Sequence, residues 1–292
     1  MSEFNTLGFI GLGVMGSRMS ANLVRRSERP VVVYDPVPEA VAQAVEAGAQ
    51  ARDSVAAVAA DADVVFLSLP SITQVESVAQ GILTAPRRPA VVVDMSTSDV
   101  TRTRELAQAL GKEGVLLVDA PVARQRQAAE AGTLLITVGA PEETFTALQP
   151  LLSCMGSDIV HAGEVGAGQV LKIMNNMVLF INMNALAEAL AIGRAAGVRP
   201  ETLFATLQLG SADSFALRNT ASATMLVDEF PTKAFPTDYA IKDLALALQL
   251  AKDSDIPAGA ARQTMELLRR VHDAGLGDAY YPVMIKVIEG RV

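Results

Sequence analysis

A glycine-rich run near the start of the chain has the spacing of a dinucleotide-binding loop. It follows a short apolar run and opens the first helical pattern, and it reads Gly11-Leu12-Gly13-Val14-Met15-Gly16. Glycines at this spacing permit a tight turn and a close backbone approach, so a pyrophosphate can bind at the N-terminus of the helix. The pattern alone is weak, and a glycine turn without a ligand is the alternative. Here the strand before it, the helix after it and an acid at the end of the next strand are all predicted.

That acid is Asp35, which follows the apolar run Pro30–Tyr34. A carboxylate at this place can accept hydrogen bonds from both ribose hydroxyls of an adenosine. It would also repel a 2′-phosphate, by at most ~4 kcal/mol for two unit charges ~4 Å apart at an effective dielectric constant of ~20. The sequence therefore favours NAD, with NADP as the alternative if the side chain rotates or an arginine lies nearby.

Polar residues interrupt the most apolar segment of the chain. Lys172, Asn175 and Asn176 are three and four residues apart, so they can line one side of a helix. A lysine held against an apolar wall loses its proton more easily, which suits it to protonate a carbonyl oxygen during hydride transfer. The alternative is a lysine that extends to solvent while the asparagines cap backbone groups. Spacing alone leaves both interpretations open.

The other reactive side chains give weaker patterns. His161 and His272 are the only histidines, and neither has an obvious Ser or Cys partner in sequence, so we expect surface or structural roles. Cys154 is flanked by Leu152 and Met155, which predicts a buried, inert thiol. No metal-ligand spacing stands out, and we expect no metal site.

The elements that position these residues alternate in the first half of the chain. Strands are expected at Leu7–Ile10, Pro30–Tyr34, Val64–Leu69, Val91–Met95, Leu116–Asp119 and Thr133–Val138. Helices are expected at Met15–Arg26, Val37–Ala47, Thr73–Leu83 and Val100–Leu110, with another opening at Pro141. This alternation predicts βαβ units and a mostly parallel sheet.

Helical patterns take over after Gly163, so we expect one domain over residues 1–163 and a second over 164–292. Gly168–Ala196 would form one helix, ~43 Å long at 1.5 Å per residue. Because it is apolar on most sides, we expect other helices or a second subunit to cover it, which favours a homodimer or homotetramer.

Composition narrows the class of protein further. The chain has 292 residues, 50% of them hydrophobic and 19% charged, which is typical of a compact globular protein. A formal net charge of −8 argues against nucleic-acid binding. The N-terminal sequence lacks the pattern of a signal peptide, and the apolar segment contains Lys172 and several asparagines, which are costly in a membrane. We expect a cytoplasmic protein with no membrane partner.

Six motifs in order give the chain a specific resemblance. They are GFIGLGVMGSRMSANL, the pair Leu69-Pro70, DMSTSD, DAPV…GTL…VGA, GxxGxGxxxKxxNN and KDLALA. Over nearly its whole length the chain resembles the β-hydroxyacid dehydrogenases, the group around 3-hydroxyisobutyrate dehydrogenase and tartronate semialdehyde reductase. The resemblance implies an α/β N-terminal Rossmann domain with a doubly wound, mostly parallel sheet. It also implies an all-α C-terminal domain, a long interdomain helix and an active site in the cleft between the domains.

The resemblance implies roles for the matching residues. Lys172 would be the catalytic general acid and base, and Asn176 an amide that helps to hold the substrate. Ser96 would contact the substrate, and Lys242 would close on both substrate and cofactor. The implied cofactor-binding residues are Gly11, Leu12, Gly13, Val14, Met15, Gly16, Asp35, Leu69, Pro70, Gln74, Thr97, Lys242 and Asp243. Of these, Gln74 is a weaker match, because the family often has asparagine there.

The chain departs from the family at one substrate loop. After DAPV the family usually has Ser-Gly-Gly, whose hydroxyl and amides hold the substrate carboxylate, but this chain has Ala123-Arg124-Gln125-Arg126. Arginine binds anions through charge-assisted hydrogen bonds, and in an extended loop Arg124 and Arg126 would point the same way. In this loop the chain resembles sulfolactaldehyde reductase, a branch of the family that has Gly-Arg in place of Ser-Gly and binds a sulfonate. We expect Arg124 to anchor the substrate anion, with Ala123 and Gln125 beside it; a solvated surface arginine is the alternative.

We therefore expect an NAD(P)-dependent oxidoreductase that acts on CH–OH groups and interconverts a small acidic aldehyde or ketone with its hydroxy acid. The substrate anion would be a sulfonate or phosphonate held by Arg124, or a carboxylate as in 3-hydroxyisobutyrate or tartronate semialdehyde. Imine reductases share the implied architecture but commonly lack the lysine at Lys172. A non-catalytic dinucleotide-binding module on this fold would tend to lose that lysine, and here both Lys172 and Lys242 remain.

Overall fold

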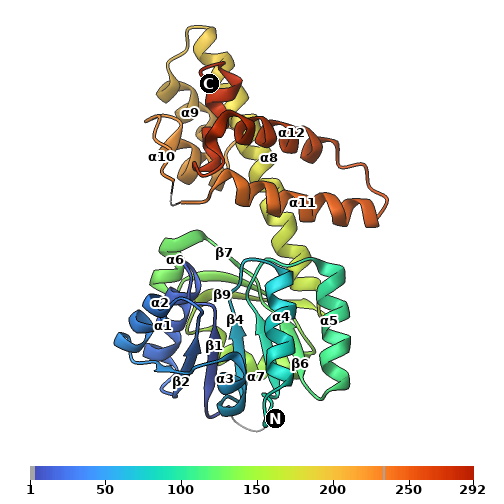
Figure 1. The fold of residues 1–292 in the computed structure, drawn as a ribbon. Coiled ribbons are helices and arrows are strands. Elements are labelled where there is room, and N and C mark those ends of the chain that lie inside the picture. Colours follow the sequence, from blue (N-terminus) through green and yellow to red (C-terminus); the bar gives the residue numbers. More distant parts are fainter. Residues whose placement is uncertain (1–3, 233) are drawn as a thin grey trace. The chain divides into compact units, whose positions relative to one another are not determined.

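The computed structural model describes residues 4–232 and 234–292 and separates into two units (Figure 1). The first unit ends at Lys172 and contains every strand of the described residues, whereas the second runs from Ile173 to Val292 and is helical. The boundary between the units falls inside one long helix, α8 (Ala167–Ala195). The predicted fold class, an α/β domain followed by an all-α domain, is confirmed.

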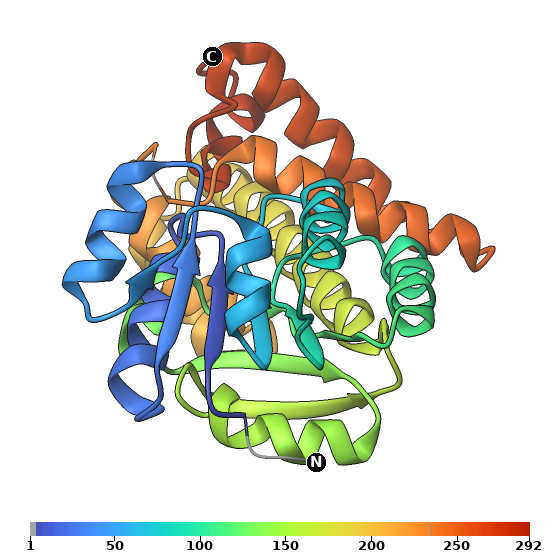
Figure 2. The same ribbon diagram turned by 60° about the horizontal axis from the view of Figure 1, so that its bottom comes forward.

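One sheet of nine strands, counted over the described residues, forms the centre of the first unit. The strands are β1 (Leu7–Ile10), β2 (Val31–Tyr34), β3 (Gln50–Ala51), β4 (Val64–Leu67), β5 (Val91–Asp94), β6 (Leu116–Asp119), β7 (Val122–Ala123), β8 (Leu134–Gly139) and β9 (Gly156–Gly163). Their order is β3-β2-β1-β4-β5-β6-β8-β7, and β9 pairs with β8. The first six strands are parallel, while β8 runs antiparallel to β6 and β7. Figure 2 shows β8 and β9 side by side, and their pairing is parallel.

Helices cover both faces of this sheet, because successive residues of its strands point to opposite sides. The helices are α1 (Gly16–Arg26), α2 (Pro38–Glu46), α3 (Val55–Asp61), α4 (Ile72–Leu83), α5 (Val100–Lys112), α6 (Gln125–Ala131) and α7 (Glu142–Leu152). Phe9 of β1 lies in a core with residues of α1, α2, α6 and α7, while its neighbour Ile10 lies in a core with residues of α3, α4 and α5. The sheet is therefore doubly wound, as the sequence predicts.

The second unit is built on the remaining length of α8. It continues with α9 (Pro200–Leu209), the π-helical segment η1 (Ala216–Ala221), α10 (Ser222–Thr224), α11 (Thr237–Asp253), α12 (Gly259–Val271), η2 (His272–Leu276), η3 (Tyr281–Val283) and α13 (Met284–Ile288). An aromatic cluster of Phe180, Phe235 and Tyr281 joins α8 to the C-terminal half of the unit. By length and composition alone α8 could cross a membrane. However, it carries buried polar side chains, including Gln169 and Asn176, which would be costly in a membrane.

Candidate active site

The loop between β1 and α1 requires glycine where the chain turns and leaves room where a ligand would approach. Gly11 has a φ of +94°, and a Cβ atom on it would lie 2.3 Å from the carbonyl oxygen of Ser68. A Cβ atom on Gly16 would lie 1.9 Å from the carbonyl oxygen of Gly11. A Cβ atom on Gly13, by contrast, would meet no atom of the described residues within 4 Å. This cradle fits a pyrophosphate at the N-terminus of α1.

Asp35, at the end of β2, braces this loop. Its carboxylate accepts hydrogen bonds from the backbone N–H of Leu12 at 2.6 Å and from that of Val37 at 2.8 Å. A carboxylate has about four acceptor positions, so two such bonds leave capacity for the ribose hydroxyls that the sequence predicts it to bind. The side chain thus lies beside the phosphate loop, and ribose binding stays a prediction.

The segments that follow β4 and β5 are joined by buried hydrogen bonds. The hydroxyl oxygen of Ser96 accepts from the backbone N–H of Leu69 at 2.9 Å. The carboxylate of Asp94 accepts from the Ser96 N–H at 2.9 Å and from the Ser98 hydroxyl at 2.7 Å. These bonds hold together two segments that the sequence assigns to one site, because Thr97 lies between Ser96 and Ser98 and Pro70 follows Leu69.

A second buried carboxylate, Asp119 at the end of β6, accepts hydrogen bonds at the beginning of α8. Its two oxygens accept from the backbone N–H of Gly166 at 2.6 Å and from that of Gln169 at 2.7 Å. Burial raises the pKa of Asp119 from its ordinary value of 3.8 to about 6, against the lowering effect of these hydrogen bonds, and the nearby charge of Asp94 raises it further. Sequence reasoning missed both Asp119 and Gln169, although both lie inside the quoted motifs.

Lys172 follows one turn later on α8. The residue is 9% exposed, which favours a buried lysine over one extended into solvent, and its catalytic role stays a prediction. In the second unit the amide of Asn176 donates to Asp243 at 2.7 Å, and the ammonium of Lys242 lies 3.1 Å from the other oxygen of Asp243. The structure therefore brings Asn176, Lys242 and Asp243 together, as expected of residues that share a site.

The loop that departs from the family corrects one expectation. Ala123 ends the strand β7, but residues 124–126 are not extended, because Arg124 and Gln125 have φ values of +86° and +65° and α6 begins at Gln125. The strand alternation that would have pointed Arg124 and Arg126 the same way is therefore absent. The guanidinium of Arg124 forms an ion pair with Asp158 and a hydrogen bond with the Ser157 hydroxyl at 3.2 Å. Its role as an anion anchor stays a prediction.

The histidines and the cysteine have structural surroundings. The ring of His161 bonds to the carbonyl oxygen of Ala140 and stacks on Phe145. His272 pairs with Asp238, and this carboxylate raises its pKa. Cys154 is buried, as predicted, and burial raises the pKa of its thiol. The described residues contain no group of three or more His, Cys, Asp or Glu that could hold a metal ion.

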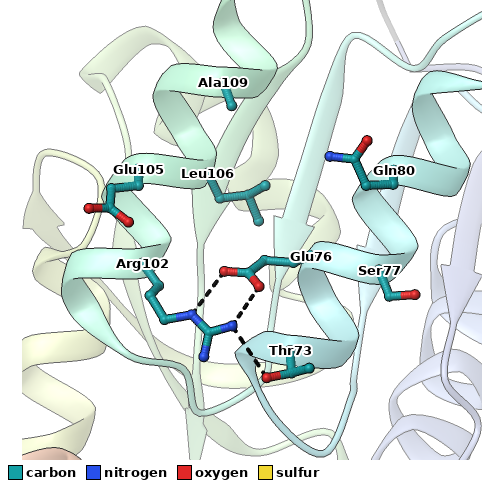
Figure 3. A pocket seen from close by; sticks show the side chains of 8 residues that line it. All are labelled: Thr73, Glu76, Ser77, Gln80, Arg102, Glu105, Leu106 and Ala109. Atoms are coloured by element: carbon teal, nitrogen blue, oxygen red, sulfur yellow. Dashed lines mark hydrogen bonds and ion pairs between the residues drawn. The ribbon is translucent and has the colours of Figure 1, made fainter.

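The hollow shown in Figure 3 is separate from these residues. It has a volume of about 490 Å³ and is lined by residues of α4 and α5. An ion pair between Arg102 and Glu76 crosses it, and the guanidinium of Arg102 also bonds to the Thr73 hydroxyl at 3.3 Å. None of the predicted site residues lines it. The hollow therefore adds nothing to the candidate active site.

The doubly wound sheet, its glycine loop and the helical second unit define a dinucleotide-dependent oxidoreductase, and comparison with known proteins gives the family. Residues 6–163 match the family model for the NAD binding domain of 6-phosphogluconate dehydrogenase. Residues 166–288 match the model for the NAD-binding domain of NADP-dependent 3-hydroxyisobutyrate dehydrogenase. The chain belongs to the β-hydroxyacid dehydrogenase family, and it is an NAD(P)-dependent oxidoreductase that acts on CH–OH groups.

Individual relatives match nearly the whole chain. It is 38% identical to 2-(hydroxymethyl)glutarate dehydrogenase of Eubacterium barkeri, over 99% of this chain and 96% of that protein. It is 37% identical to 3-hydroxyisobutyrate dehydrogenase of Pseudomonas aeruginosa, over 92% and 93%. The solved structure of Mycobacterium tuberculosis 3-hydroxyisobutyrate dehydrogenase with L-serine superposes with a TM-score of 0.90 at 31% identity, over 97% and 99%. These relatives support a dehydrogenase over an imine reductase or a non-catalytic module.

Proposed function

We propose that this enzyme interconverts a small aldehyde or ketone that carries an acidic group with the corresponding hydroxy acid, and that Lys172 moves the proton. The observation that carries this proposal is the burial of a lysine one turn into α8, where the family motif has its catalytic lysine. In reduction the ammonium of Lys172 gives a proton to the carbonyl oxygen, and in oxidation the neutral amine removes the hydroxyl proton. A lysine in a buried site gives up its proton more readily than one in water.

The other predicted residues bind and orient the cofactor and the substrate. When bound, the nicotinamide cofactor supplies or accepts the hydride, with its phosphates on Gly11–Gly16 and its ribose at Asp35. The carboxylate of Asp35 favours NAD, because it would repel the 2′-phosphate of NADP. Ser96 and Asn176 would contact the substrate, while Asp243 holds the ammonium of Lys242 where it can meet an anionic group.

We propose a carboxylate as the anionic group of the substrate. The 2-(hydroxymethyl)glutarate and 3-hydroxyisobutyrate dehydrogenases reported above are named for hydroxylated carboxylic acids, which supports this choice by similarity. A sulfonate or phosphonate is the second candidate, because Arg124 adds a guanidinium where the family usually has glycine. For Arg124 to hold such an anion, it would have to exchange its ion pair with Asp158 for the substrate.

A matched set of aldehydes tests both the reaction and the anion. The set carries a terminal carboxylate, sulfonate, phosphonate or no anion on the same carbon skeleton, and oxidation of NADH or NADPH is followed by absorbance. We expect turnover of the carboxylate with NADH above NADPH, and little turnover of the neutral aldehyde. Preference for the sulfonate or phosphonate would establish the second candidate. No turnover of any aldehyde in the set would contradict the proposed function.

The enzyme is further proposed to act as a homodimer or homotetramer in the cytoplasm. Large apolar side chains on α8 are exposed, namely Leu171, Val178 and Ile192, and Ile192 is 68% exposed. Apolar side chains that share one helix in this way are usually covered by another subunit.

A further inference from the structure

Two residues that are assigned no contact with substrate or cofactor hold the beginning of α8 in place. We propose that Gln169 and Asp119 are positioning residues for the reaction, because they fix the first turn of α8, and with it Lys172, to the loop that carries Ser96. This inference rests on the proposed role of Lys172 as the proton donor. All of these residues lie in the first unit.

The side chain of Gln169 uses both ends of its amide on one loop. Its nitrogen donates to the carbonyl oxygen of Ser96 at 2.8 Å, and its oxygen accepts from the backbone N–H of Ser98 at 2.9 Å. The residue is 0% exposed, so water does not compete for these bonds. A buried amide with both ends engaged has one orientation, and Gln169 therefore fixes the distance between α8 and the loop after β5.

The carboxylate of Asp119 fixes the same turn from another strand. The first N–H groups of a helix have no partner within the helix, and a carboxylate there is favoured by the helix dipole. Asp119 takes two such N–H groups, those of Gly166 and Gln169. The approach is close, because a Cβ atom on Gly168 would lie 2.8 Å from one Asp119 oxygen and one on Gly139 would lie 2.2 Å from the other.

These contacts give the two residues a role in the reaction beyond stability. Lys172 lies three residues after Gln169 on the same helix, so a shift of the first turn moves the ammonium group as well. The loop held by Gln169 contains Ser96 and Thr97, which are expected on the substrate and nicotinamide sides. A displacement of about 1 Å between reacting groups can lower a rate by about 100-fold. Gln169 therefore sets the distance between the group that moves the proton and the loop beside the hydride.

The test compares kcat, KM and folding in Gln169→Met, which keeps the size of the side chain and removes both hydrogen bonds. We expect kcat to fall on the order of 100-fold, while KM and NADH affinity change less than about 3-fold. Rates are referred to the concentration of NADH-binding sites, found by fluorescence titration, so partial unfolding does not lower the measured kcat. Gln249→Met, at an exposed position of α11, is the matched control. A lower melting temperature with unchanged kcat would overturn the proposal.

Asp119→Asn provides a second test of the positioning role, and Lys172→Ala separates its failure from a failure of the proposed function. If Gln169→Met yields no NADH-binding protein, Asp119→Asn takes its place, since it removes one acceptor without changing shape and should lower kcat with KM retained. Lys172→Ala is measured in the same assay. An inactive Lys172→Ala beside a fully active positioning variant overturns this inference alone. An active Lys172→Ala overturns the proposed function instead.

Discussion

Arg124 and Gln125 have a backbone conformation that is unusual for residues with side chains. Their φ values of +86° and +65° lie in the left-handed region, where glycine is favoured and other residues are strained. The resemblance places the two family glycines at these same positions. Two residues with side chains therefore adopt a conformation that favours glycine, and the extended loop expected from the residue types did not form.

The conformation of this loop predicts a gain in stability from Gln125→Gly. A left-handed conformation costs a non-glycine residue roughly 1–2 kcal/mol, which glycine avoids. Glycine in turn loses more conformational entropy on folding, which costs roughly 0.5–1 kcal/mol. We expect the free energy of unfolding to rise by up to about 1 kcal/mol in urea denaturation. The control is Gln127→Gly in the middle of α6, which should lower it by about 1 kcal/mol. Equal effects of both substitutions would contradict the role of the backbone angle.

At the residue scale the sequence predicted the groups that carry motifs and missed the groups that support them. The glycine loop, Asp35 and Lys172 are recognisable from spacing and residue type. Asp119 and Gln169 are not, because Asp119 bonds to Gln169, 50 residues away in the chain, and Gln169 bonds to Ser96, 73 residues away. Such pairs form only when the sheet places the strand ends beside one another.

The beginning of the helix α8 depends on a side chain from another element. A carboxylate from β6 takes the place of an N-cap residue, and burial raises the pKa of that carboxylate to about 6. Between its ordinary value of 3.8 and 6, the folded protein holds this proton more tightly than the unfolded chain does. Asp119 therefore makes a contribution to stability that falls as pH rises through this range.

A comparison with Asp119→Asn isolates this contribution, because the variant has no proton to lose at this position. We expect the free energy of unfolding of the wild type, minus that of Asp119→Asn, to be smaller at pH 7 than at pH 5 by about 1 kcal/mol. Urea denaturation at the two pH values measures it. A difference that is the same at both pH values would show that Asp119 does not titrate in this window.

Elements with strong patterns were predicted closely, and weakly patterned ones were not. The strands β1 and β6 have the expected bounds, and α8 begins one residue earlier than expected. The strand β9 was missed, because only one of its residues is buried and it exists through its pairing with β8 rather than through an apolar pattern. The helix α6 was missed because it follows Arg124, whose left-handed conformation cannot be predicted from its residue type.

The net charge of the whole molecule has the same sign as the charge of the proposed substrate. A chain with a net charge of −8 must bind an anionic substrate through local cations, and in the proposal these are Lys242 and, for a sulfonate or phosphonate, Arg124. Two-domain organisation, a dinucleotide cofactor and the family could all be predicted from the order of the motifs. The identity of the substrate could not, because it depends on the loop at residues 123–126, where the family pattern is broken.

The turnover of Lys172→Ala tests the central claim most directly. Removing a general acid typically lowers a rate by about 10²–10⁴-fold, so we expect kcat with the preferred aldehyde to fall by that factor. NADH affinity, measured by fluorescence titration, should stay within about 2-fold of the wild type, because the cofactor loops are unchanged. Lys252→Ala, at an exposed position near the end of α11, is the control and should keep the wild-type rate. A Lys172→Ala enzyme with a near-normal rate would remove this lysine from the mechanism.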